Sequence, residues 1–93
     1  MDEASRKLAR HALGLPNDQR KSYRNRYFAN SEGRVFDIWC GLVEQGLAVG
    51  PEMATGISLA RFELTDVGAK LSLEPGETLC REDFPNATRR VSA

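Results

Sequence analysis

The histidine and cysteine side chains of this 93-residue chain, which can bind zinc or act in nucleophilic catalysis, are His11, Cys40 and Cys80. Zinc sites and thiol–imidazole nucleophiles need such groups in pairs or clusters, at spacings that bring them to one point. Here each stands alone, and the sequence contains neither a glycine-rich phosphate loop nor a Gly-x-Ser-x-Gly turn. We therefore expect a protein that is not an enzyme and that needs no metal or cofactor.

The stretch 20–28 combines basic and aromatic residues in a way that is typical of nucleic-acid contacts. Guanidinium and ammonium groups neutralise phosphates, and aromatic rings stack on bases. The alternative is that the rings belong to the core and that the charged side chains are solvated or pair with acidic residues of the same chain. The candidate nucleic-acid-binding residues are Arg20, Lys21, Tyr23, Arg24 and Arg26.

A second candidate surface is acidic. Carboxylates on the outer face of one predicted helix and in the C-terminal part of the chain can bind a basic groove on a protein, including one that normally holds nucleic acid. The alternative is a solvated face with no partner. The candidate protein-binding residues are Asp37, Glu44, Glu77, Glu82 and Asp83.

The net charge of zero hides an asymmetry along the chain. Residues 1–34 hold eight basic and four acidic side chains, which gives +4, whereas residues 35–93 hold five basic and nine acidic ones, which gives −4. Such a charge distribution can steer a charged partner to either end of the protein. It can equally make the two halves attract each other within one fold.

Length and composition indicate an ordinary globular domain, with 41% hydrophobic and 28% charged residues. A chain of this size buries roughly 60–65% of its unfolded surface, which is enough for one core. We expect a single domain over residues 1–85 and a flexible tail over residues 86–93. No apolar run approaches the ~20 residues of a membrane span. We therefore expect a cytoplasmic protein with reduced cysteines and no membrane contact.

Hydrophobic spacing predicts three helices, over residues 2–13, 32–45 and 66–73. Asp2 or Ser5, Ser31 and Thr65 are the expected N-caps. One strand is expected to begin at residues 47–49, and a second is expected over residues 57–64. A weaker extended segment is expected at residues 23–28. The structure of residues 17–30 stays open at this point. The expected core consists of Phe36, Ile38, Trp39, Leu42, Leu47, Phe62, Leu64 and Leu71.

Residues 34–71 resemble the recognition helix, wing and closing helix of MarR-like winged-helix proteins. The resemblance is carried by Leu42, Gly46 and Leu47 at a helix end, then by Leu64-Thr65 and Gly68 after the second strand. It implies an α+β, winged-helix-like fold that is mostly helical with a small antiparallel β-sheet. Winged helices bind nucleic acid or protein.

Residues 8–28, together with 76–79 and 82–85, look like a class of small proteins encoded in bacteriophages and prophages. Proteins of this kind include transcriptional regulators and anti-CRISPR inhibitors. The resemblance implies an origin in a mobile genetic element. We expect a monomer or homodimer in the host cytoplasm that binds a host protein or protein–nucleic acid complex. The leading hypothesis is an inhibitor or modulator of host machinery, and the alternative is a DNA-binding transcriptional regulator.

Two features of the sequence favour the protein partner. A helix-turn-helix has about three or four residues between its helices, whereas seventeen residues (14–30) separate the first two predicted helices here. The outer face of the second helix carries Asp37 and Glu44 against a single Arg34. Carboxylates at those positions would repel DNA phosphates. We therefore expect DNA binding to be weak and non-specific.

Overall fold

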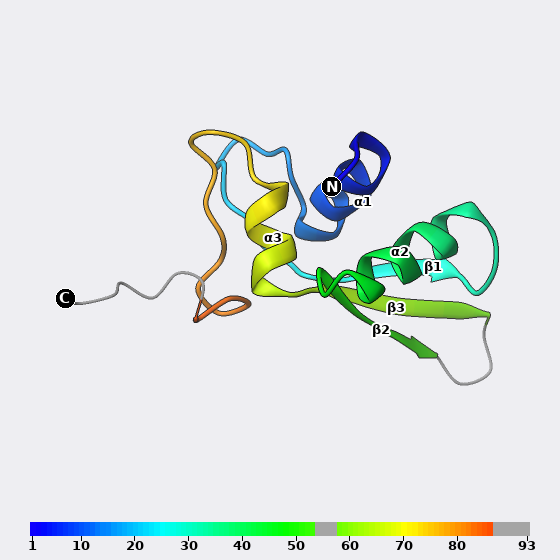
Figure 1. The fold of residues 1–93 in the computed structure, drawn as a ribbon. Coiled ribbons are helices and arrows are strands. Elements are labelled where there is room, and N and C mark those ends of the chain that lie inside the picture. Colours follow the sequence, from blue (N-terminus) through cyan, green and yellow to red (C-terminus); the bar gives the residue numbers. More distant parts are fainter. Residues whose placement is uncertain (54–57, 87–93) are drawn as a thin grey trace.

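The computed structural model describes residues 1–53 and 58–86, and it shows an α+β fold (Figure 1). Three helices accompany a three-stranded antiparallel sheet. In chain order the elements are α1 (Glu3–Leu13), β1 (Tyr27–Asn30), α2 (Arg34–Glu44), β2 (Ala48–Met53), β3 (Leu59–Leu64) and α3 (Asp66–Ser72). The predicted order of a helix, a two-stranded hairpin and a closing helix is confirmed in α2, β2, β3 and α3.

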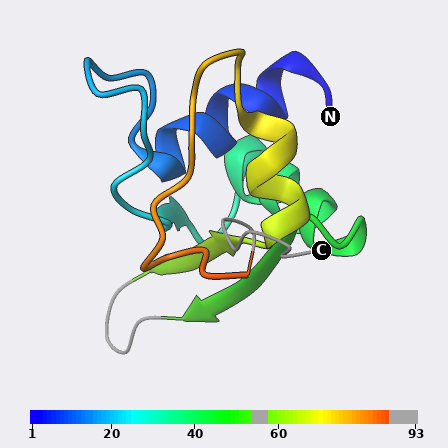
Figure 2. The same cartoon turned by 90° about the vertical axis from the view of Figure 1, so that its left-hand side faces the viewer.

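The sheet has the strand order β1-β3-β2, so the hairpin of β2 and β3 is extended by a strand from earlier in the chain. Tyr27 lies opposite Phe62, and Ala48 lies opposite Leu64. The extended segment was predicted at 23–28, but the strand begins only at Tyr27. The three helices lie on one side of the sheet in both views (Figure 1; Figure 2). Alternate residues of β3 are therefore buried against them.

The core lies between α2 and the sheet, and its centre is aromatic. The Trp39 ring stacks on Phe62, with 5.4 Å between ring centres, and Phe36 meets Phe62 edge-on at 5.8 Å. Five of the eight predicted core residues are buried, Phe36 packs against them, and Ile38 is half-buried. The buried five are Trp39, Leu42, Leu47, Phe62 and Leu64.

The prediction that Leu71 belongs to the core is wrong, because its side chain is 52% exposed. Helix α3 turns its small residues inward instead. A Cβ atom on Gly68 would lie 1.9 Å from the carbonyl oxygen of Leu47, so only glycine permits this approach. Ala69 and Ser72 are buried on the same face. This packing leaves Val67 and Leu71 on the outer face of α3.

The helix ends follow the predicted caps in two of three cases. The Asp2 carboxylate accepts from the backbone N–H of Ser5 at 2.7 Å, and the Thr65 hydroxyl accepts from that of Gly68 at 3.2 Å. The cap predicted at Ser31 is wrong: α2 begins at Arg34 behind Gly33, and no side chain caps it. The backbone N–H of Ser31 instead donates to Ser58, which prolongs the pairing of β1 with β3.

The segment after α3 contains neither helix nor strand up to residue 86, and it runs beside the segment that follows α1 (Figure 1). A parallel bridge between Lys21 and Thr78 joins the two. Leu79 and Phe84 are buried. Of the predicted tail, residues 87–93 lie outside the described part of the chain, as does the start of the second predicted strand, residue 57.

None of the helices in residues 1–53 and 58–86 is long and apolar enough to cross a membrane.

Candidate functional site

Two of the candidate nucleic-acid-binding residues hold the end of α1. The Arg24 guanidinium donates twice to the carbonyl oxygen of His11, from Nη2 at 2.7 Å and from Nε at 3.2 Å. It also lies 5.2 Å from the centre of the Tyr23 ring. That ring packs so tightly on Gly14 that a Cβ there would come within 2.2 Å of it. A cation at the last carbonyls of a helix is stabilising, so both side chains have a structural role.

The other three basic candidates point in different directions. Arg20 donates from Nη2 to the Pro75 carbonyl at 2.6 Å, so its charge is turned toward the C-terminal segment. The side chains of Lys21 and Arg26 form no hydrogen bond or ion pair with any residue in the described ranges. The structure therefore divides the predicted basic surface into internal anchors and two unpaired cations.

Arg24 and Arg26 meet at a hollow of about 250 Å³ beside the start of β1, lined also by His11, Tyr27 and Phe28. The Phe28 ring is 50% exposed there. Cations beside an exposed ring suit a phosphate with its base. His11 was not among the predicted site residues, because the sequence gives no reason to place it near β1. Phe28 is the last residue of the stretch 20–28 that was predicted to contact nucleic acid.

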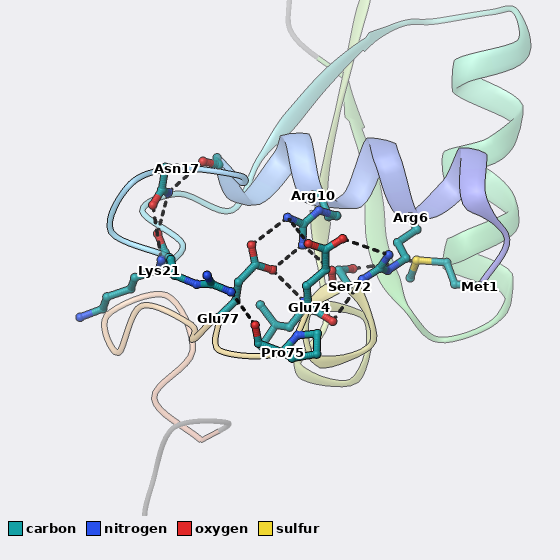
Figure 3. A network of polar contacts seen from close by, with 12 residues as sticks. Met1, Arg6, Arg10, Asn17, Lys21, Ser72, Glu74, Pro75 and Glu77 are labelled. Carbon is teal, nitrogen blue, oxygen red and sulfur yellow. Dashed lines mark hydrogen bonds and ion pairs between the residues drawn. The ribbon is translucent and has the colours of Figure 1, made fainter.

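Glu77 does not belong to the predicted acidic surface, because it forms an ion pair with Arg10 (Figure 3). Nη2 of Arg10 donates to Oε2 of Glu77 at 2.8 Å, and Nη1 donates to Oε1. The side chains of Arg10 and Glu77 are only 11% and 5% exposed. The hydrogen bond from Arg10 lowers the pKa of Glu77 to about 2, and the pKa of Arg10 is raised in turn.

This ion pair is the centre of a network that joins α1 to the segment after α3. Nη1 of Arg10 also donates to the Ser72 carbonyl at 3.0 Å. The backbone N–H of Glu74 donates to Glu77 at 2.7 Å, and the carboxylate of Glu74 lies 3.8 Å from Arg6. The network thus holds the C-terminal segment against the fold, and Glu77 is not available to a partner.

The acidic residues of α2 do remain on the surface. Asp37 and Glu44 are exposed on its outer face, and neither pairs with a cation in the described part of the chain. Burial raises the pKa of the half-buried Cys40 thiol, and the negative charges of Asp37 and Glu44 raise it further. Both carboxylates therefore lie close enough to Cys40 to affect the pKa of its thiol.

Glu82 and Asp83, the remaining acidic candidates, are exposed on the C-terminal segment. They belong to a different part of the chain from α2, and no interaction joins the two pairs within residues 1–53 and 58–86. The predicted acidic residues that stay exposed thus come from two different segments, α2 and the segment after α3.

The fold assembles no metal-binding cluster in the part of the chain that the structure describes. Within residues 1–53 and 58–86 no group of three or more His, Cys, Asp or Glu side chains lies close enough to hold a metal ion. Cys40 and Cys80 are free thiols, both half-buried. The His11 ring packs edge-on against Tyr27, with 5.3 Å between ring centres.

No family model, curated protein or solved structure matches this chain, so its function has to be argued from the residues themselves.

Proposed function

We propose that this protein is a non-enzymatic binding protein of phage or prophage origin that acts on a host protein or protein–nucleic acid complex. The observation that carries the proposal is the outer face of α2, where Asp37 and Glu44 are exposed without a cation partner among the described residues. They lie seven positions apart, which is two helical turns and about 10 Å along one face. An inhibitor or modulator of host machinery, such as an anti-CRISPR, fits this chemistry.

The charge of this face favours a basic protein surface as the partner. Complementary charge accelerates encounter with such a surface and excludes partners of like charge. DNA is a partner of like charge, because phosphates repel carboxylates at the positions where a recognition helix needs donors. A protein groove that normally holds nucleic acid has the opposite, matching charge.

The second candidate function is a winged-helix regulator that binds DNA. Two observations favour it: the order of α2, the hairpin and α3, and the hollow that brings Arg26 and Arg24 beside Phe28. Against it, twenty residues including β1 separate α1 from α2, so the described residues contain no tightly joined pair of helices. Arg20 and Arg24 are also occupied by backbone carbonyls.

The first experiment is capture of the tagged protein from host extract, followed by mass spectrometry. The variant Asp37→Lys/Glu44→Lys should lose the partner that the wild type retains. A control with the same change in charge, Glu3→Lys/Asp18→Lys, replaces two exposed acids that lie outside α2 and should retain it.

A DNA-binding assay at physiological salt separates the two functions. We expect weak binding that vanishes there, because few phosphate contacts are available. A nanomolar, sequence-selective complex that Arg26→Ala weakens would instead establish the regulator. Arg26 is the appropriate position, because replacing Arg24 would also disturb the end of α1.

A further inference from the structure

A hollow of about 450 Å³ lies beside the C-terminal segment, and three cations from distant parts of the chain line it. They are Lys21, Lys70 and Arg81, all of them exposed. Leu73 and Leu79 give the hollow an apolar part, and Glu77 and Thr78 complete its lining. We refer to it as the cation hollow. It is distinct from the hollow at His11 and from the acidic face of α2.

Backbone pairing, rather than attraction between side chains, brings Lys21 close to the C-terminal segment. The backbone N–H of Thr78 donates to the Arg20 carbonyl at 2.9 Å, and that of Ser22 donates to the Thr78 carbonyl at 3.0 Å. The Ser22 hydroxyl also accepts from the backbone N–H of Cys80 at 2.7 Å. Cys80, which precedes Arg81, is therefore held beside Ser22, which follows Lys21.

The three cations have no counter-ion in the described part of the chain. None of their side chains forms an ion pair or hydrogen bond there. The one carboxylate in the lining, Glu77, is already paired with Arg10 on both oxygens. The Lys21 side chain extends away from that pair (Figure 3). Cations that line one hollow without a counter-ion can be balanced by a multiply charged anion.

We propose that the cation hollow binds a nucleotide-type phosphate ester. A phosphomonoester carries about −1.5 to −2 charges at neutral pH, which two or three cations balance. Arg81 can hold phosphate oxygens in a bidentate manner, while the lysines act as point charges. The leucines give an uncharged ring an apolar surface to rest on. The volume also lies in the range of small-molecule sites, roughly 300–1,000 Å³.

Calorimetric titration of the full chain with ADP tests this inference, with adenosine and inorganic pyrophosphate as the comparison ligands. ADP should bind, adenosine should show no binding, and pyrophosphate should bind more weakly than ADP, because the site uses both charge and apolar contact. Affinity for ADP should fall as salt is raised. Lys70→Ala and Arg81→Ala should each weaken it about five- to tenfold.

The matched control is Lys7→Ala, which removes an exposed cation of α1 that lines neither hollow and should leave ADP affinity unchanged. The variant Asp37→Lys/Glu44→Lys should also leave it unchanged, so this inference can fail independently of the proposed protein partner. Absence of ADP binding at millimolar concentration would overturn the inference. So would equal affinity in Lys70→Ala/Arg81→Ala, or binding of a single-stranded oligonucleotide through these residues without binding of ADP.

Discussion

Two glutamates of this molecule, Glu77 and Glu44, have the same side chain and very different surroundings. Glu77 lies in the segment after α3, almost fully buried against Arg10 of α1. Glu44 lies exposed at the end of α2, with no cation partner in the described part of the chain. In sequence they belong to one acidic half. The difference shows that the charge available to a partner is what remains after internal pairing.

The two regions also differ in what their charges do for the fold. Breaking a buried ion pair leaves an uncompensated charge, which is strongly unfavourable, whereas an exposed carboxylate is stabilised by water alone. The network around Glu77 therefore stabilises the fold, because it joins α1 to the segment after α3, which has no helix or strand up to residue 86. The exposed carboxylates of α2 therefore contribute little to folding.

The largest expected effect is that of Glu77→Gln. It should reduce the free energy of unfolding by about 2–3 kcal/mol, because Arg10 loses its hydrogen-bonded counter-charge and keeps only the carboxylate of Glu74, 3.7 Å away. The matched control Glu44→Gln removes the same charge from α2 and should change stability by less than about 0.5 kcal/mol. Chemical denaturation of both variants measures the contrast. Equal losses in the two variants would show that the network does not hold the fold.

The contribution of Glu77 to stability should also appear when the free energy of unfolding is measured as the pH is lowered. The pKa of Glu77 is about 2 in the folded protein, against an ordinary value of 4.5. A lowered pKa stabilises the fold fully above the unfolded value, and that stabilisation is lost as the pH falls through the folded value. About 3 kcal/mol should disappear between roughly pH 5 and pH 2.

The control for the pH experiment is Glu77→Gln itself, whose unfolding free energy should fall less steeply over the same range. Denaturation curves at several pH values measure both slopes. If the free energy of unfolding fell equally steeply with pH in the two proteins, carboxylates other than Glu77 would cause the loss of stability in acid.

The same distinction between internal and available charge applies to the basic residues. Arg24→Ala should destabilise the protein by about 1 kcal/mol, because it removes hydrogen bonds to the last turn of α1 and contact with Tyr23. Arg26→Ala, two residues on, should have almost no effect on the thermal midpoint. If Arg26→Ala were the more destabilising of the two, the assignment of anchor and free cation would be reversed.

The smallest expected change in stability is at the N-terminal end of the acidic face. Asp37 lies in the first turn of α2, where a negative charge is favourable, so Asp37→Asn should cost at most about 0.5 kcal/mol. Thermal unfolding at low and moderate salt measures this, and the cost should shrink as salt is added. A loss above about 1 kcal/mol would mean that Asp37 has a structural role.

The sequence predicted those elements that local signals define. The hydrophobic stripe of α2, Gly46 after it and the Thr65 cap all act within a few residues, so the order of the helices and the hairpin was predicted correctly, although α2 begins two residues later than predicted. Leu71 was misplaced because the seven-residue α3 is too short for its apolar spacing to decide its inward face. The close approach of Gly68 to Leu47 decides it instead.

The candidate sites depended on contacts that no local pattern reveals. Arg10 and Glu77 are 67 positions apart, and the pairing of the segments around Lys21 and Thr78 brings three cations to one hollow. Periodicity reports which face of an element is apolar, but it does not report which distant charge that element will meet. Glu77 was therefore assigned to the surface, and Lys70 and Arg81 were overlooked.

The most direct test of the account is the association rate of this protein with the host partner recovered by capture, measured at about 150 mM salt. If the unpaired carboxylates of α2 make the contact, Asp37→Lys/Glu44→Lys should slow association at least about tenfold, since charge steers encounter. The control Glu3→Lys/Asp18→Lys should associate at the wild-type rate. Unchanged association in Asp37→Lys/Glu44→Lys would contradict the claim that the outer face of α2 is the binding surface.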